Sequence, residues 1–124
     1  GNLNTDIGVP MTLLRMTQAH THCAIELGMN HPGEIAYLAG LARPTIAVVT
    51  NAQREHQEFM KTVAAAAEEN ASVFESLPSD GVAVVNGDDE QAHIFRRAKG
   101  ARRTVEFKIE GEADVTATYS LGPL

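Results

Sequence analysis

The sequence is poor in cysteine, in basic residues and in long apolar runs, and each shortage excludes a class of protein. Cys23 is the only cysteine, so no disulfide can form within the chain, and its apolar neighbours predict a small core residue rather than a nucleophile. The 10 basic residues against 16 acidic ones give a formal charge of −6, which argues against a nucleic-acid-binding surface. We expect no signal peptide, and no apolar stretch of the sequence approaches the ~20 residues of a membrane span. We therefore expect a soluble cytoplasmic protein.

The residues that are present indicate an α/β fold. Hydrophobic residues make up 44% of the 124 positions and charged residues 21%, which is ordinary for a globular domain with its own core. Short apolar runs alternate with stretches of helical periodicity. The predicted strands are about 22–27, 45–50 and 81–86, and the predicted helices run from Pro10 to Met16, over 33–42, from about 51 to 77, and from 87 to 95.

The last third of the chain has a different pattern. Residues 105–109 and 115–119 alternate between apolar and polar side chains, which is typical of half-exposed strands near the edge of a sheet. We expect a mostly parallel sheet flanked by helices, with antiparallel edge strands near the C-terminus.

Two metal-competent side chains stand at the ends of predicted strands. Glu26 closes the first apolar run and His56 follows the second. The carboxyl ends of parallel strands meet at one edge of a sheet, where open α/β folds bind their ligands. Taken alone, Glu26 could equally face solvent or cap the next helix, and His56 could be a surface or packing residue.

Three segments resemble the central domain of the Mur ligases. They are residues 1–10 (GNLNTDIGVP), 26–35 (ELGMNHPGEI) and 51–59 (NAQREHQEF). The resemblance implies a P-loop NTPase-like domain of an ATP-dependent ligase. It also points to the branch of the family that joins D-alanyl-D-alanine to UDP-N-acetylmuramoyl-tripeptide in peptidoglycan precursor synthesis.

One motif of that family is missing. No Gly-x-x-x-x-Gly-Lys-Ser/Thr phosphate loop occurs in the sequence, so no residue is predicted to bind the nucleotide. We expect residues 1–124 to be a single partial domain, without the phosphate loop and the N- and C-terminal domains, and to be inactive alone.

The resemblance assigns Glu26 and His56 to a magnesium site beside ATP, and His56 also a catalytic role. A carboxylate suits magnesium, which prefers oxygen ligands and often takes only one or two from protein. Mur ligases commonly carry a carbamylated lysine about fourteen residues after the histidine, but Asn70 stands at that spacing here. Asn70, or the nearby Glu68 or Glu69, could supply the missing oxygen ligand. For residues 56 and 70 to approach one site, the helix must break between them, with Thr62 as an N-cap.

The polar turns are the candidate substrate contacts. Asn2, Asn4 and Thr5 lie in a loop before a helix start, and Asn30 and His31 form a turn that could orient a peptide substrate. The alternative is that these residues only cap the helices that follow them.

Asn86 and Asp88 follow the third strand in a segment that matches the family's Asn-x-Asp-Asp. Their assignment to the site stays open, because acidic residues at a helix start are favoured by the helix dipole in any case.

A second function class also fits the pattern, namely a non-catalytic flavodoxin-like α/β module that binds a ligand or a partner. The two readings differ in whether Glu26 and His56 open onto one crevice.

Overall fold

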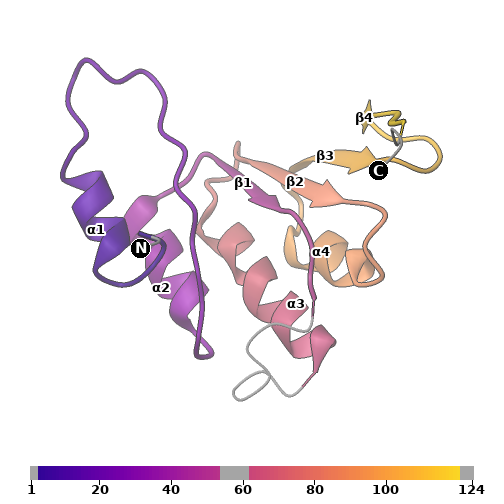
Figure 1. Ribbon diagram of the computed structural model, residues 1–124, viewed down its shortest axis with the longest axis horizontal. Helices are drawn as coiled ribbons and strands as arrows, with labels where there is room; N and C mark the ends of the chain where they lie inside the picture. The colour runs from indigo at the N-terminus through magenta and orange to yellow at the C-terminus, as the bar shows by residue number, and fades with distance from the viewer. Residues whose placement is uncertain (1–2, 54–61, 121–124) are drawn as a thin grey trace.

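The computed structural model describes residues 3–53 and 62–120 and forms an α/β layer structure. Four strands are hydrogen-bonded in the order β1-β2-β3-β4: Ile46–Val49, Val82–Asn86, Arg103–Lys108 and Val115–Thr116. All neighbouring strands are parallel. The helices α2 (Glu34–Ala42), α3 (Val63–Ala71) and α4 (Ala92–Ala98) lie on one side of this sheet, and α1 (Gly8–Leu13) lies beyond α2 (Figure 1).

Burial along the strands follows from this arrangement. In β1 the side chains of Ala47 and Val49 are buried, whereas Ile46 and Val48 remain 60% and 54% exposed. Successive side chains of a strand point to opposite faces. The buried set therefore faces the helices and packs against the fully buried Phe74 and Phe95 in one core cluster.

The predicted strands at 45–50 and 81–86 and the helix at 33–42 are confirmed, with small shifts at their ends. The strand predicted at 22–27 is wrong. Residues 22–29 are not part of a strand, because they pair with no neighbouring strand in the described part of the chain. The prediction of Cys23 as a core residue is also wrong, since this residue is exposed.

The prediction of antiparallel edge strands near the C-terminus is also wrong. After β3 the chain loops away through residues 109–114 and returns alongside β3 in the same direction, pairing Phe107 with Val115. Carboxylates hold this loop in place of a hairpin turn: Glu106 N donates to Asp114 Oδ2 at 2.8 Å, and Ile109 N donates to Asp88 Oδ2 at 2.5 Å.

The break predicted between residues 56 and 70 is confirmed at its C-terminal side. Thr62 is the N-cap of α3, and its Oγ1 accepts a hydrogen bond from Ala65 N at 3.1 Å. The helix then passes at residue 72 into a short 3-10 helix, η1 (Ser72–Ser76), rather than continuing as one helix to residue 77. The helix predicted from 87 begins instead at Ala92, because residues 87–91 form turns. None of the helices within 3–53 and 62–120 has the length and apolar character needed to cross a membrane.

Candidate functional site

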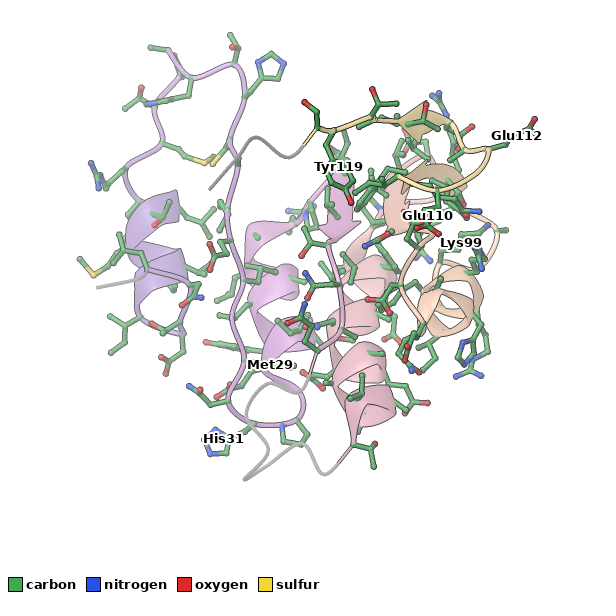
Figure 2. The ribbon with its side chains drawn as sticks, turned by 45° about the vertical axis from the view of Figure 1, so that its right-hand side comes forward. Met29, His31, Lys99, Glu110, Glu112 and Tyr119 are labelled. Carbon is green, nitrogen blue, oxygen red and sulfur yellow. The ribbon has the colours of Figure 1, made fainter. Side chains whose placement is uncertain are left out.

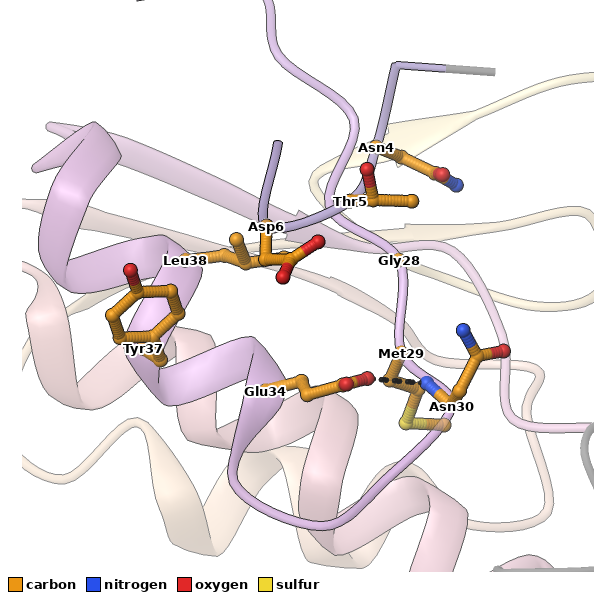
Figure 3. Close-up of a pocket in the computed structure, with 9 residues that line it drawn as sticks. All are labelled: Asn4, Thr5, Asp6, Gly28, Met29, Asn30, Glu34, Tyr37 and Leu38. Carbon is orange, nitrogen blue, oxygen red and sulfur yellow. Dashed lines mark hydrogen bonds between the residues drawn. The ribbon is translucent and has the colours of Figure 1, made fainter. Parts of the chain in front are cut away.

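A pocket of about 190 Å³ lies between the N-terminal loop, the extended segment before α2 and the first turns of α2. Figure 3 shows the side chains around it. The lining residues come from these three pieces of chain: Asn4, Thr5, Asp6, Gly28, Met29, Asn30, Glu34, Tyr37 and Leu38.

The N-terminal loop is fixed to the extended segment by Asn4. Its side-chain Nδ2 donates to Glu26 Oε1 at 2.8 Å, and its carbonyl oxygen accepts from Gly28 N at 2.8 Å. A Cβ atom added at Gly28 would lie 2.6 Å from Asn4 Nδ2, so a larger residue there would displace the Asn4 side chain. The metal candidate Glu26 is therefore tied by a hydrogen bond to a residue that lines the pocket.

The turn before α2 closes through the carboxylate of Glu34. This carboxylate accepts hydrogen bonds from Asn30 N at 2.5 Å and His31 N at 3.0 Å, and it lies 3.2 Å from His31 Nδ1. The backbone N–H of Asn30, followed by that of His31, lowers the pKa of Glu34 below its ordinary value. The carboxylate thus stays ionised at neutral pH and presents Asn30 toward the pocket.

His31 and Met29 lie on opposite sides of the same short segment. The His31 side chain is 57% exposed and stands at the outer tip of the turn, as Figure 2 shows. Met29 is only 7% exposed and belongs to the core cluster. The segment is therefore anchored at Met29, and His31 is accessible from outside the pocket.

The segment after β2 forms hydrogen bonds with the segments that follow β1 and β3. Asn86 Nδ2 donates to Thr50 O at 2.8 Å, and Ala52 N donates to Asp89 Oδ2 at 2.7 Å, so both side chains hold the chain that leaves β1. Asp88 Oδ2 accepts from the backbone after β3, including Ile109 N. These contacts support the structural alternative for Asn86 and Asp88.

The structure brings together three of the predicted substrate contacts, Asn4, Thr5 and Asn30, around one pocket. Asn2 and His56 lie outside the described residues, so the expected convergence of Glu26 and His56 stays a prediction. In the described part of the chain, no three His, Cys, Asp or Glu side chains form a cluster that could hold a metal ion.

Asn70 is half-buried near the end of α3, and the two carboxylates beside it have other partners. Glu68 Oε1 lies 3.4 Å from Arg97 NH2 at the surface. Glu69 accepts backbone hydrogen bonds from Gly33 and Ile35.

Sequence reasoning missed the wall of the pocket that α2 provides. Tyr37 and Leu38 were predicted only as parts of a helix, yet both line the pocket together with Glu34, which the prediction placed in the polar turn. Their spacing of three and four residues places them on one helix face. That spacing, directly after a polar turn, is the signal that would have identified them.

Gly33 and Gly40 offer a matched test of the turn. Gly33 has φ +90°, Gly40 lies within α2, and an added Cβ would meet no atom within 4 Å at either site. We expect Gly33→Ala to lower the free energy of unfolding by about 1 kcal/mol, because the left-handed conformation disfavours a Cβ. Gly40→Ala should raise it by roughly 0.5–1 kcal/mol, because alanine favours the helix. Urea unfolding followed by circular dichroism measures both, and shifts of the same sign would contradict the assigned backbone of the turn.

Comparison with known sequences gives a consistent set of relatives. The model of the Mur ligase middle domain matches residues 1–122. The UDP-N-acetylmuramoyl-tripeptide–D-alanyl-D-alanine ligase of Escherichia coli (strain K12) is 41% identical over 119 residues, which are 95% of this chain and 26% of that protein. The ligase of the same name from Haemophilus influenzae is 37% identical over 97 residues, 78% of this chain and 21% of that protein. The chain thus spans about a quarter of the length of these relatives.

Solved structures agree with the sequences. A crystal structure of MurF from Acinetobacter baumannii superposes with a TM-score of 0.89 at 31% identity, over 95% of this chain and 26% of that one. The structure of MurF from Thermotoga maritima in complex with ADP gives a TM-score of 0.77 at 28% identity, over 90% and 26% of the two chains.

Proposed function

The chain belongs to the Mur ligase middle-domain family, and on that premise we propose that its parent protein joins D-alanyl-D-alanine to UDP-N-acetylmuramoyl-tripeptide at the expense of ATP. The observation that carries the proposal is the pocket in which Asn4, Thr5 and Asn30 meet, with Glu26 bonded to Asn4. The relatives named UDP-N-acetylmuramoyl-tripeptide–D-alanyl-D-alanine ligase support the choice of substrates. This reading replaces the flavodoxin-like binding module.

In the proposed reaction, a carboxylate of the tripeptide attacks the γ-phosphorus of ATP, which forms an acyl phosphate and releases ADP. The amine of D-alanyl-D-alanine then attacks the acyl carbon, the C–O bond to phosphate breaks, and an amide and inorganic phosphate result. The polar groups of the pocket would orient a peptide substrate, since amides and hydroxyls can bond both the N–H and the C=O groups of a peptide. Good orientation of the reacting groups is itself a large part of the rate in such transfers.

The residues present fit a magnesium ion that takes few ligands from protein. Glu26 offers an exposed carboxylate whose Oε1 already accepts from Asn4, and magnesium commonly keeps several waters and binds substrate phosphates. We assign Glu26, and by family resemblance His56, to hold it. When bound, magnesium supplies positive charge beside the γ-phosphate and so favours phosphoryl transfer.

The parent would act in the cytoplasm, in the synthesis of peptidoglycan precursors. The single cysteine is compatible with that reducing compartment, because the chain requires no disulfide.

The proposal is tested by product formation in the full-length parent. Steady-state ADP release should require both the UDP-linked tripeptide and D-alanyl-D-alanine, because the acyl phosphate formed without the dipeptide does not turn over, and mass spectrometry should find the ligated product. The 124-residue chain alone should show no magnesium-dependent ATP hydrolysis, because it has no phosphate loop to hold the nucleotide. Steady-state ADP release by the parent when one or both peptide substrates are left out, or ATPase activity of the 124-residue chain, would contradict the assignment.

A further inference from the structure

Glu69 connects two elements that are far apart in the sequence. Its carboxylate, on α3, accepts hydrogen bonds from Gly33 N, at 2.9 Å to both oxygens, and from Ile35 N at 3.0 Å. Gly33 and Ile35 flank the start of α2, 36 and 34 residues earlier. One side chain therefore ties the last turn of α3 to the turn that carries Asn30 and His31.

The start of α2 needs such a partner. The first N–H groups of a helix have no acceptor within the helix, and an N-cap side chain normally supplies one. The N-cap of α2 is Gly33, which has no side chain to offer, and its left-handed conformation is one that glycine adopts readily. Ile35 is only 3% exposed, so water cannot readily replace Glu69 at its N–H.

A second carboxylate closes the other half of the turn. Glu34 accepts from Asn30 N and His31 N, so the four residues before α2 are held at one end by Glu34 and at the other by Glu69. Glu34 belongs to the turn's own helix and moves with it. Glu69 links the turn to α3, which contributes the buried Ala66 and Ala67, and so adds to the anchoring of the segment at the buried Met29.

We propose that Glu69 is a positioning residue, which holds the Asn30–Gly33 turn so that Asn30 faces the pocket and a peptide substrate binds there. This inference rests on the proposed function, which supplies the peptide. It also gives Glu69 a different task from that of a metal ligand, since its two oxygens are already engaged by three N–H···O contacts.

The experiment compares Glu69→Ala, Glu69→Gln and the control Glu75→Ala in the full-length parent. Glu75 is an exposed carboxylate on η1. Glu69→Ala should raise the KM of a peptide substrate about tenfold while kcat and the KM of ATP change less than about twofold, because the turn positions and does not react. Glu69→Gln should recover part of the loss, since an amide oxygen in the place of Oε1 still accepts from Gly33 N and Ile35 N, whereas the NH2 group in the place of Oε2 cannot accept. Glu75→Ala should have the same kcat and the same KM values as the parent.

Two results would overturn the proposal. One is that Glu69→Ala has the same kcat and the same peptide KM as the control Glu75→Ala. The other is that kcat falls with unchanged peptide KM and recovers with added magnesium, which would make Glu69 a metal ligand.

Hydrogen exchange separates this inference from the proposed function. The Gly33 and Ile35 amides should exchange at least about tenfold faster in Glu69→Ala than in the parent. In Glu69→Gln, part of their protection should return. Both results are expected whatever reaction the parent performs. Faster exchange in a parent that makes no ligated product would leave the turn contact standing and reject the function. Unchanged exchange would reject the contact.

Discussion

Replacing Glu26 by glutamine in the full-length parent should lower kcat at least about 100-fold, or ~2.7 kcal/mol of transition-state stabilisation. Glutamine keeps an oxygen that can accept from Asn4 Nδ2, so the 2.8 Å link to the N-terminal loop can persist. The negative charge is lost, however, and with it the ligand that we assign to magnesium. The steady-state rate of ligation, measured over a range of magnesium concentrations, reports the change.

The control is Glu112→Gln, which removes the charge of an exposed carboxylate on the loop after β3, well away from the pocket (Figure 2). It should leave kcat within about twofold of the parent, as expected of a surface substitution remote from the site. Asn4→Ala separates the two roles of Glu26, because it breaks the hydrogen bond and keeps the charge. A loss in Asn4→Ala equal to that in Glu26→Gln would show that the link to the loop, and not the charge, is what matters.

The strands β1 and β2 were predicted well from the sequence. The runs that became β1 and β2 are continuous and apolar and lie beside each other in the core, so periodicity and composition were enough. Thr62 was also predictable, because an N-cap depends on the residues that follow it within one turn.

The failures concern properties that depend on a neighbour. Residues 22–27 have the composition of a strand, but a strand exists only when a second one accepts its hydrogen bonds, and none does so here among the described residues. The alternation in β3 and β4 indicates half-exposed strands but not their direction. The loop between the two strands is held by hydrogen bonds to the carboxylates of Asp88 and Asp114, contacts that the alternation alone does not predict.

In the candidate site, too, the residues defined by local sequence were predictable, and a contact between distant segments was not. Asn4, Thr5 and Asn30 were found because they lie in short turns with a distinctive local sequence, and the structure places them around one pocket. The role of Glu69 was not predictable, because its partners Gly33 and Ile35 are far away in the chain and use only their backbone N–H groups.

Asn70 should make the parent insensitive to bicarbonate. By the family resemblance, Asn70 stands where Mur ligases commonly carry a lysine, whose carbamate would form from bicarbonate-derived carbon dioxide and help to hold a metal, and an amide cannot be carbamylated. Asn70 is half-buried near the end of α3, a helix that also contributes the buried Ala66 and that begins only after the break at Thr62. We therefore expect Asn70 to face the metal cleft. Stripping bicarbonate at acidic pH and then restoring it should leave the ligation rate of the parent unchanged, whereas relatives with the lysine should lose and regain activity.

In the variant Asn70→Lys we expect the ligation rate to depend strongly on bicarbonate. Without bicarbonate, the lysine would put a positive charge beside the magnesium site, and like charges at such short range repel by an energy that exceeds 1 kcal/mol even when strongly screened. The ligation rate should fall at least about tenfold. Added bicarbonate should restore it, because carbamylation converts the ammonium into an anionic oxygen ligand. A parent that itself responds to bicarbonate would mean that another lysine carries the carbamate. An Asn70→Lys variant with full activity in the absence of bicarbonate would mean that residue 70 lies away from the metal.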